Sequence, residues 1–333
     1  MKVLAIETSC DETCAAVTEG TTILSNVVWS QVDLHKEFGG VVPSIAKRAH
    51  QDKIDWVVNK ALQDAGITTA ELGAIAVTVG PGLAIALEVG IATAKELAKK
   101  LKLPLIAVNH IEGHVLSPLA NNINLPFPAM ALVVSGKHTD LILVKAVGDY
   151  QIIASTMDDA LGEALDKAAR MLGLGYPGGA ELEKLARDGN PQAYKLPIPM
   201  LGRENLNHFS YSGLKSAFYR LVNSPGEKSP ADLAAVFQDR AFTHLTRVMT
   251  KTLATYQTKD LLVGGGVSAN QNLRARLSQF KLGVHFPTKG LYGDNAAMIG
   301  IAAGFKAQRG EFVKDTDVVD RLPRWRIDNR DMI

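Results

Sequence analysis

The same order of strands and helices occurs twice along this sequence, and that repetition restricts the fold more than any single motif. In the first copy, short apolar runs separated by polar turns are typical of strands, and apolar residues then recur at helical spacing. We predict strands at Val3–Glu7, Thr13–Thr18 and Thr22–Trp29, a helix that ends at Gly66, a strand at Ala74–Val79, a helix at Leu83–Lys102, a strand at Leu105–Val108 and a helix from about His110. This order, βββαβαβα, favours parallel pairing of the later strands with helices on the sheet faces.

The pattern then restarts and is interrupted once. We predict strands at Met130–Val134, Thr139–Val144 and Ile152–Ser155, then a strand at Leu261–Val263, a helix near Ser268–Gln279, a strand at Val284–Phe286 and a helix at Asn295–Gln308. A mostly helical stretch, about 157–253, separates the two halves of this copy. A chain of 333 residues is long enough for two domains. We therefore predict duplicated α/β domains at 1–110 and 111–333, with a helical insertion in the second.

Composition argues against a protein that coats nucleic acid through bulk charge and against a secreted disulfide-rich protein. The net charge is only +2, so nucleic acid would have to meet a local basic patch. Cys10 and Cys14 are too few for a secreted disulfide framework and match no zinc spacing, so we expect small buried residues.

No segment predicts export or membrane insertion. The opening residues lack the apolar core of a signal peptide. The apolar stretch Leu72–Ala94 is broken by Gly80–Gly82, which predicts a strand, a turn and a helix rather than a membrane span. A cytoplasmic protein is expected.

Three loops have the composition of phosphate cradles, because glycine and small hydroxyl residues let backbone N–H groups approach an anion. They are residues 8–11 (TSCD), 135–139 (SGKHT) and 264–270 (GGGVSAN), and the last joins a strand to a helix. Each alone is more simply a tight turn, but three at equivalent points of a repeat favour a nucleotide. None is a Walker A or GxGxxG motif, which argues against a P-loop or Rossmann site.

Two histidines spaced i and i+4 form a candidate metal site. His110 and His114 share one face of a predicted helix and can bind one cation, although such a pair alone is more often structural. An HExxH protease has its general base directly after the first histidine, whereas here Ile111 takes that position and Glu112 would face elsewhere. The best third ligand is Asp294, just before the last helix.

Other charged residues have less specific patterns. Asp11 and Glu12, at the tip of the first turn, either position a water, metal or nucleophile or form a solvated turn. Asp166 is equally open between a ligand contact and a surface acid. Two basic clusters are most simply solvated helix faces: Lys99, Lys100 and Lys102, and Lys47, Arg48 and Lys53.

Seven motifs occur along the chain in the following order: IETSCDET, HIEGH, VSGKHT, GEALDKAARMLGLGYPGG, FSYSGLKSA, GGGVSAN and GDNAAMI. Together they resemble the tRNA N6-adenosine threonylcarbamoyltransferases, in the bacterial TsaD branch. The resemblance extends over essentially the whole chain. It implies the actin-like ATPase (ASKHA) fold, which agrees with the repeated βββαβαβα order.

The resemblance implies a group transfer to RNA. Members move threonylcarbamoyl from threonylcarbamoyl-adenylate to the exocyclic amine of the tRNA adenine 3′ of the anticodon, and AMP leaves. The implied metal ligands are His110, His114 and Asp294, with one divalent ion per subunit, iron (Fe2+) favoured or zinc. The implied contacts to the adenylate, or to ATP or AMP, are Val134, Ser135, Gly136, Lys137, His138, Asp166, Gly179, Glu183 and Asn270.

The resemblance also implies partners. These are tRNA, an inactive paralogue of the TsaB type and a small ATPase of the TsaE type. Val134 stands where the archaeal and eukaryotic branch has a tyrosine ligand, which favours the bacterial branch. The donor is a mixed anhydride with a good leaving group, so the site needs positioning and charge stabilisation rather than a covalent nucleophile. We expect Asp11 or Glu12 to accept or relay the amine proton.

Two positions depart from the family pattern. Lys137 stands where the family normally has glycine, and we expect its side chain to point outward. Tyr292 and Gly293 precede Asp294 where Cys-Thr is common, a milder change. Two other functions stay open: an actin-like nucleotide-binding regulatory or chaperone-type ATPase module, which would not need the histidines, and a metalloprotease, which leaves the nucleotide loops unexplained.

Overall fold

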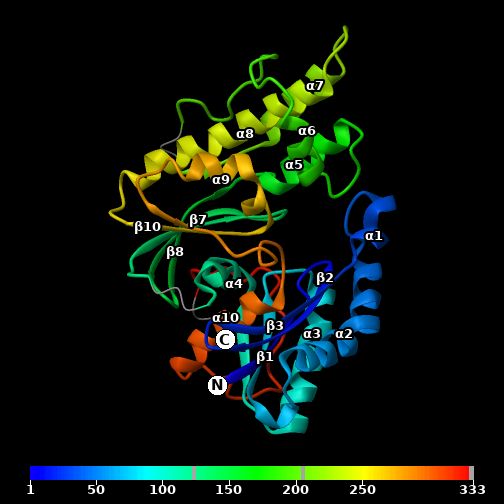
Figure 1. Ribbon diagram of the computed structural model, residues 1–333, viewed down its shortest axis with the longest axis vertical. Coiled ribbons are helices and arrows are strands. Elements are labelled where there is room, and N and C mark those ends of the chain that lie inside the picture. The colour runs from blue at the N-terminus through cyan, green and yellow to red at the C-terminus, as the bar shows by residue number, and fades with distance from the viewer. Residues whose placement is uncertain (122–124, 204–206, 330–333) are drawn as a thin grey trace. The chain divides into compact units, whose positions relative to one another are not determined.

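The computed structural model describes residues 1–121, 125–203 and 207–329. Contacts within the chain divide it into two compact units, each built around one mixed sheet (Figure 1). Unit 1 consists of Met1–Pro126, Ala146–Tyr150 and Phe286–Ile333, and unit 2 consists of Phe127–Lys145 and Gln151–His285. The predicted boundaries at 1–110 and 111–333 concern the two copies of the repeat, and they stay a prediction.

Unit 1 contains a five-stranded sheet in the order β3-β2-β1-β4-β5. The strands are β1 (Lys2–Glu7), β2 (Glu12–Glu19), β3 (Thr22–Ser30), β4 (Leu72–Gly80) and β5 (Leu105–Asn109). The first three pair antiparallel, and β4 and β5 continue the sheet parallel to β1. The helices are α1 (Val32–His35), α2 (Pro43–Ala65), α3 (Ala84–Leu101), α4 (His110–Leu116) and α10 (Ala296–Gln308), with short 3-10 turns at Lys36–Phe38, Thr69–Glu71 and Ser117–Leu119.

Alternation along β1 explains how this sheet is covered. Leu4 and Ile6 belong to the core that α2 and α3 close, whereas α10 packs against β1 and β2. A Cβ on Gly300 would lie 2.6 Å from side-chain atoms of Thr18, so only glycine lets α10 lie this close. Because helices cover both faces, β1 and β4 are buried along nearly their whole length. The loop after β1 and the helix after β5 carry the candidate site of this unit.

Unit 2 is built around a six-stranded sheet in the order β11-β10-β6-β7-β8-β9. Its strands are β6 (Ala129–Val134), β7 (Thr139–Ala146), β8 (Asp149–Thr156), β9 (His208–Phe209), β10 (Asp260–Gly264) and β11 (Gly283–His285). The β6–β7 pair is antiparallel, and β10 pairs in parallel with β6 and β11. The helices are α5 (Leu161–Met171), α6 (Gly179–Ala186), α7 (Ser212–Val222), α8 (Pro230–Leu253) and α9 (Gln271–Leu277), with a 3-10 turn at Gly266–Ala269.

The element order confirms both copies of the predicted pattern, and α5–α8 lie between β8 and β10. The stretch Leu72–Ala94 is a strand, a turn and a helix, as predicted. Gly66 ends α2 with a φ of 65°, but this helix begins at Pro43, well before the apolar repeat that predicts it. Its first half buries mainly alanines and His50, which make a weak periodic signal. Within the described ranges, no helix is both long and apolar enough to cross a membrane.

Candidate functional site

The three candidate metal ligands meet within unit 1. His110 and His114 lie on α4, and Asp294 comes just before α10. One ligand atom from each of the three lies within 4.8 Å of the others. Asp294 Oδ1 is 3.0 Å from His114 Nε2 and 3.5 Å from His110 Nε2. Two imidazole nitrogens and one carboxylate oxygen suit Fe2+ or Zn2+ and leave coordination positions open, so these residues fit a divalent metal ion.

Local sequence explains why these groups converge. The Asn109 side chain caps α4, because its Oδ1 accepts hydrogen bonds from two N–H groups of the first turn at 2.9 and 3.3 Å. Gly113 lets α10 pack closely, since a Cβ there would lie 3.0 Å from the side chains of Met298 and Ile299. This close packing brings Asp294, at the start of α10, within reach of the histidines.

A buried carboxylate orients the first histidine. Glu7 is fully buried, and its Oε2 lies 3.2 Å from His110 Nδ1, while Ser9 Oγ lies 3.1 Å from the same nitrogen. Thr78 also donates a hydrogen bond to Glu7. Burial alone would raise the pKa of Glu7, but the His110 ring outweighs it and lowers that pKa. A carboxylate at Nδ1 holds the proton there and leaves Nε2 free to bind a metal.

The second histidine is held differently. His114 is fully buried, and burial lowers its pKa, which favours the neutral ring that ligation requires. Its Nε2 faces Asp294, but its Nδ1 has no hydrogen-bond partner among the described residues. This ring is therefore held by its contact with Asp294 and by the packing of α4.

The acidic pair predicted at the first turn lies in the same unit. Asp11 is in the turn, but Glu12 is the first residue of β2 rather than part of the turn tip. Strand alternation puts Glu12 on the same face as Cys14, whose thiol lies 3.8 Å from the carbonyl oxygen of Asp294. Burial, with the charges of Asp11 and Asp294, raises the pKa of Glu12 well above its usual range. A carboxyl with a raised pKa holds a proton more readily than an ordinary surface acid.

Two residues of this region were not predicted. Glu7 lies inside a motif of the sequence, and the only signal for it is an acid that ends an apolar strand. His50 on α2 is buried, with Nδ1 2.8 Å from Thr13 Oγ1 and Nε2 3.0 Å from the carbonyl of Cys10, so it holds the loop after β1. Both cysteines are free and buried, as predicted.

The predicted substrate contacts all belong to unit 2. Residues 135–138 form a tight turn between β6 and β7, in which Ser135 Oγ accepts hydrogen bonds from the N–H groups of Lys137 and His138 at 3.3 and 3.1 Å. Gly162 at the start of α5 donates its N–H to Ser135 O at 3.1 Å. The Lys137 side chain is exposed, which agrees with the expectation that it points outward.

The other predicted contacts are linked to this turn through neighbouring segments. Asp166 accepts hydrogen bonds from the N–H groups of Gly178 and Gly179 at 2.9 and 2.8 Å, and burial raises its pKa. Glu183 accepts one from the N–H of Gln271 at 2.8 Å, directly after Asn270.

The glycine loop after β10 lies against the end of β6. Gly265 has a φ of +89°, and a Cβ on it would lie 2.3 Å from Val134 O. Segments 134–138, 265–271 and the ends of α5 and α6 therefore form one connected group in unit 2, while the metal ligands form another in unit 1.

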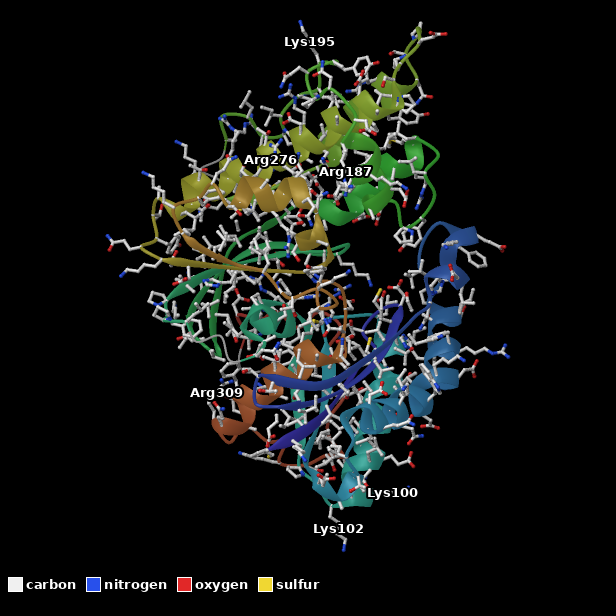
Figure 2. The ribbon with its side chains drawn as sticks, viewed as in Figure 1. Lys100, Lys102, Arg187, Lys195, Arg276 and Arg309 are labelled. Atoms are coloured by element: carbon white, nitrogen blue, oxygen red, sulfur yellow. The ribbon has the colours of Figure 1, made fainter. Side chains whose placement is uncertain are left out.

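The remaining predicted residues do not join either group. Glu112 points away from the metal ligands and accepts a hydrogen bond from Tyr150, so it is not placed as the general base of a protease. In the basic clusters, Lys47 pairs with Glu88 and Lys99 pairs with Asp317. Figure 2 shows Lys100 and Lys102 projecting outward at the end of α3.

Comparison with known proteins gives close relatives. The family model described as TsaD, tRNA N6-adenosine threonylcarbamoyltransferase, matches residues 22–301. A tRNA N6-adenosine threonylcarbamoyltransferase of Streptococcus mutans is 47% identical over 320 residues, which is 94% of this chain and 94% of the relative. One of Moorella thermoacetica is 48% identical over 322 residues, which is 93% of each chain.

Solved structures give the fold. HypF of T. kodakarensis superposes with a TM-score of 0.61 at 14% identity, over 95% of this chain and 48% of that one. Component A of the (R)-2-hydroxyglutaryl-CoA dehydratase of Acidaminococcus fermentans gives a TM-score of 0.57 at 13% identity, over 92% of this chain and 99% of that one. At such identities the likeness concerns the fold alone, and it confirms the actin-like ATPase fold expected from the sequence.

Proposed function

This chain belongs to the tRNA N6-adenosine threonylcarbamoyltransferase family, and from that premise we propose that it transfers threonylcarbamoyl from threonylcarbamoyl-adenylate to the exocyclic amine of the tRNA adenine 3′ of the anticodon, releasing AMP. The transfer sits well with the site chemistry. The donor already carries a good leaving group, so the enzyme needs to hold amine and carbonyl together and to stabilise the departing phosphate.

We assign the metal site to His110, His114 and Asp294, with Fe2+ favoured over Zn2+ as the occupant. The observation that carries the assignment is the convergence of these three ligand atoms, backed by the Glu7 carboxylate on the outer nitrogen of His110. Such an ion supplies positive charge and open positions for a phosphate or carboxylate oxygen. Glu7 keeps His110 in the metal-binding tautomer, and the i, i+4 spacing puts both rings on one side of α4.

We assign binding of the adenylate, or of ATP or AMP, to the connected loops of unit 2. Turn 134–138 and the glycine loop offer backbone N–H groups to phosphate. The residues assigned are Val134, Ser135, Gly136, Lys137, His138, Asp166, Gly179, Glu183 and Asn270. Asp166 and Glu183 each brace a backbone N–H of a neighbouring segment, which fixes the shape of the site before the ligand binds.

For the proton of the attacking amine we assign Asp11 or Glu12 as the group that accepts or relays it. The raised pKa of Glu12 favours acceptance of a proton by this carboxyl. We also propose that the protein acts in the cytoplasm together with an inactive TsaB-type paralogue and a small TsaE-type ATPase. The exposed ends of the basic clusters, including Lys100 and Lys102, are the candidate contacts for the tRNA backbone.

A transfer assay tests the proposal. The protein is mixed with both partner proteins, unmodified tRNA and threonylcarbamoyl-adenylate, and the modified nucleoside is measured by mass spectrometry. We expect product that disappears after chelation and returns on adding Fe2+ or Zn2+. Full activity after exhaustive chelation would contradict the metal site. Absence of product from a protein that still binds AMP would favour the ATPase-module function instead.

Lys137 is assigned to the adenylate through its backbone N–H, so replacing its exposed side chain with glycine should change the transfer rate by no more than about twofold, because surface substitutions shift free energies by about 0.5 kcal/mol or less. The side chain is exposed, and the backbone bond from Lys137 N to Ser135 survives the change. The rate is measured at saturating and at limiting adenylate. A large gain in either would mean that the lysine impairs the loop.

A further inference from the structure

The helix that carries the metal ligands also carries a buried carboxylate that the proposed reaction does not use. At 3.6 residues per turn, Glu112 points about 200° away from both His110 and His114. It is 4% exposed, and its Oε1 accepts a hydrogen bond from Tyr150 Oη at 2.9 Å. Tyr150 is the second residue of β8, and the segment Ala146–Tyr150, which contains the turn between β7 and β8, belongs to unit 1 by its contacts.

The face of α4 opposite the histidines is not tightly packed around the Tyr150–Glu112 hydrogen bond. Glu112 and Tyr150 line a cavity of about 440 Å³ together with Lys306 and Arg309. Figure 2 labels Arg309 at the end of α10. Lys306 Nζ is 4.0 Å from Glu112 Oε2, beyond hydrogen-bond distance, and is closer to Glu311 at 2.9 Å. Of Tyr150 and Lys306, the Tyr150 hydroxyl is therefore the closer polar contact of the Glu112 side chain.

The two histidines on the opposite face of α4 show why the Tyr150–Glu112 contact matters for the metal. The His110 ring is fixed by Glu7 and Ser9 at its outer nitrogen. The outer nitrogen of His114 has no such partner among the described residues. The direction of the second ring depends on its Nε2 contact with Asp294, on the buried packing around it and on the rotation of the seven-residue helix.

We propose that the Tyr150–Glu112 hydrogen bond sets the rotation of α4 and that both are positioning residues for His114. This rests on the metal site proposed above. The Asn109 cap fixes the start of the helix, and Glu112, on the next turn, fixes its angle from behind. Loss of the bond leaves all three ligands in place but loosens the direction of one of them.

The test is Tyr150→Phe, which removes one hydroxyl and keeps the ring. Zn2+ affinity is measured by competition with a chromophoric chelator, and the Co2+-loaded protein is compared by its visible absorption spectrum. We expect affinity about tenfold weaker and an altered Co2+ spectrum, at the low end of the about 10–100-fold that direct partners of metal ligands are worth, because this bond acts through the helix. Tyr194→Phe is the matched control, because that hydroxyl accepts a hydrogen bond from Ser229 N at 3.0 Å within unit 2. It should leave Zn2+ affinity unchanged.

Substitution of the carboxylate separates its hydrogen bond from its charge. Glu112→Gln keeps an oxygen for Tyr150 and should retain most of the Zn2+ affinity, whereas Glu112→Ala should lose as much as Tyr150→Phe. Wild-type affinity and spectrum in Tyr150→Phe, with loss of binding in His114→Ala, would overturn the positioning role but not the metal site. Wild-type affinity in His114→Ala would overturn the metal site itself.

Discussion

Replacing His114 with alanine should lower the transfer rate by about a hundredfold or more, since a metal ion contributes several kcal/mol to a reaction of this kind. His114 is one of the three proposed protein ligands, and its Nε2 lies 3.0 Å from Asp294 Oδ1. Two remaining ligands hold a divalent ion much less firmly. AMP binding should not change, because the loops assigned to the nucleotide belong to unit 2.

The measurement is single-turnover transfer with each variant, alongside AMP binding by calorimetry. His208→Ala is a suitable control, because that histidine is exposed and lies on β9 of unit 2. It should transfer at the wild-type rate. Full activity in His114→Ala would refute the ligand assignment, and parallel loss of AMP binding would point to general damage instead.

Replacing Gly265 with alanine should cost about 2–4 kcal/mol of stability, the range for a side chain forced into a strained backbone and a backbone clash. The new Cβ would lie 2.3 Å from Val134 O, and the φ of +89° is one that side chains rarely adopt. Either the glycine loop or the end of β6 has to move. Both segments carry residues assigned to the nucleotide, so AMP binding should weaken by about tenfold or more.

Denaturant unfolding and AMP titration check this expectation. Gly266→Ala is the matched control in the same loop, because a Cβ there meets nothing within 4 Å. It should unfold at nearly the wild-type midpoint. Equal stability of the two variants would show that the close approach to Val134 is not a real constraint.

Sequence patterns predict the elements of this fold well, because each strand or helix is encoded locally. The weak point is α2, whose first half presents alanines and His50 to the core and so lacks strong apolar spacing. Periodicity alone does not identify the fold. The prediction of the fold depends on the seven motifs, because they resemble those of a known family. Local spacing also singles out His110 and His114, since i and i+4 share a helix face.

Sequence patterns do not predict contacts between distant segments of the chain. Glu7 and His110 are 103 residues apart, and no local pattern indicates that they meet. The same holds for Tyr150, which lies 38 residues after Glu112. Only the pairing of strands and the packing of α4 place these side chains together. The roles given to Asp11, Glu12 and the nucleotide contacts stay predictions until the variants are measured.

The segments that form unit 1 are synthesised at very different times. His114 and Asp294 are 180 residues apart. All of unit 2 except its first 19 residues, 127–145, lies in the sequence between the segment Ala146–Tyr150 and Phe286. At 5–20 residues per second, that separation takes roughly 10–40 s of synthesis. During this interval the two histidines exist on a nascent chain without their carboxylate partner. Metal loading at the proposed site is therefore a late event, which follows the emergence of residue 294.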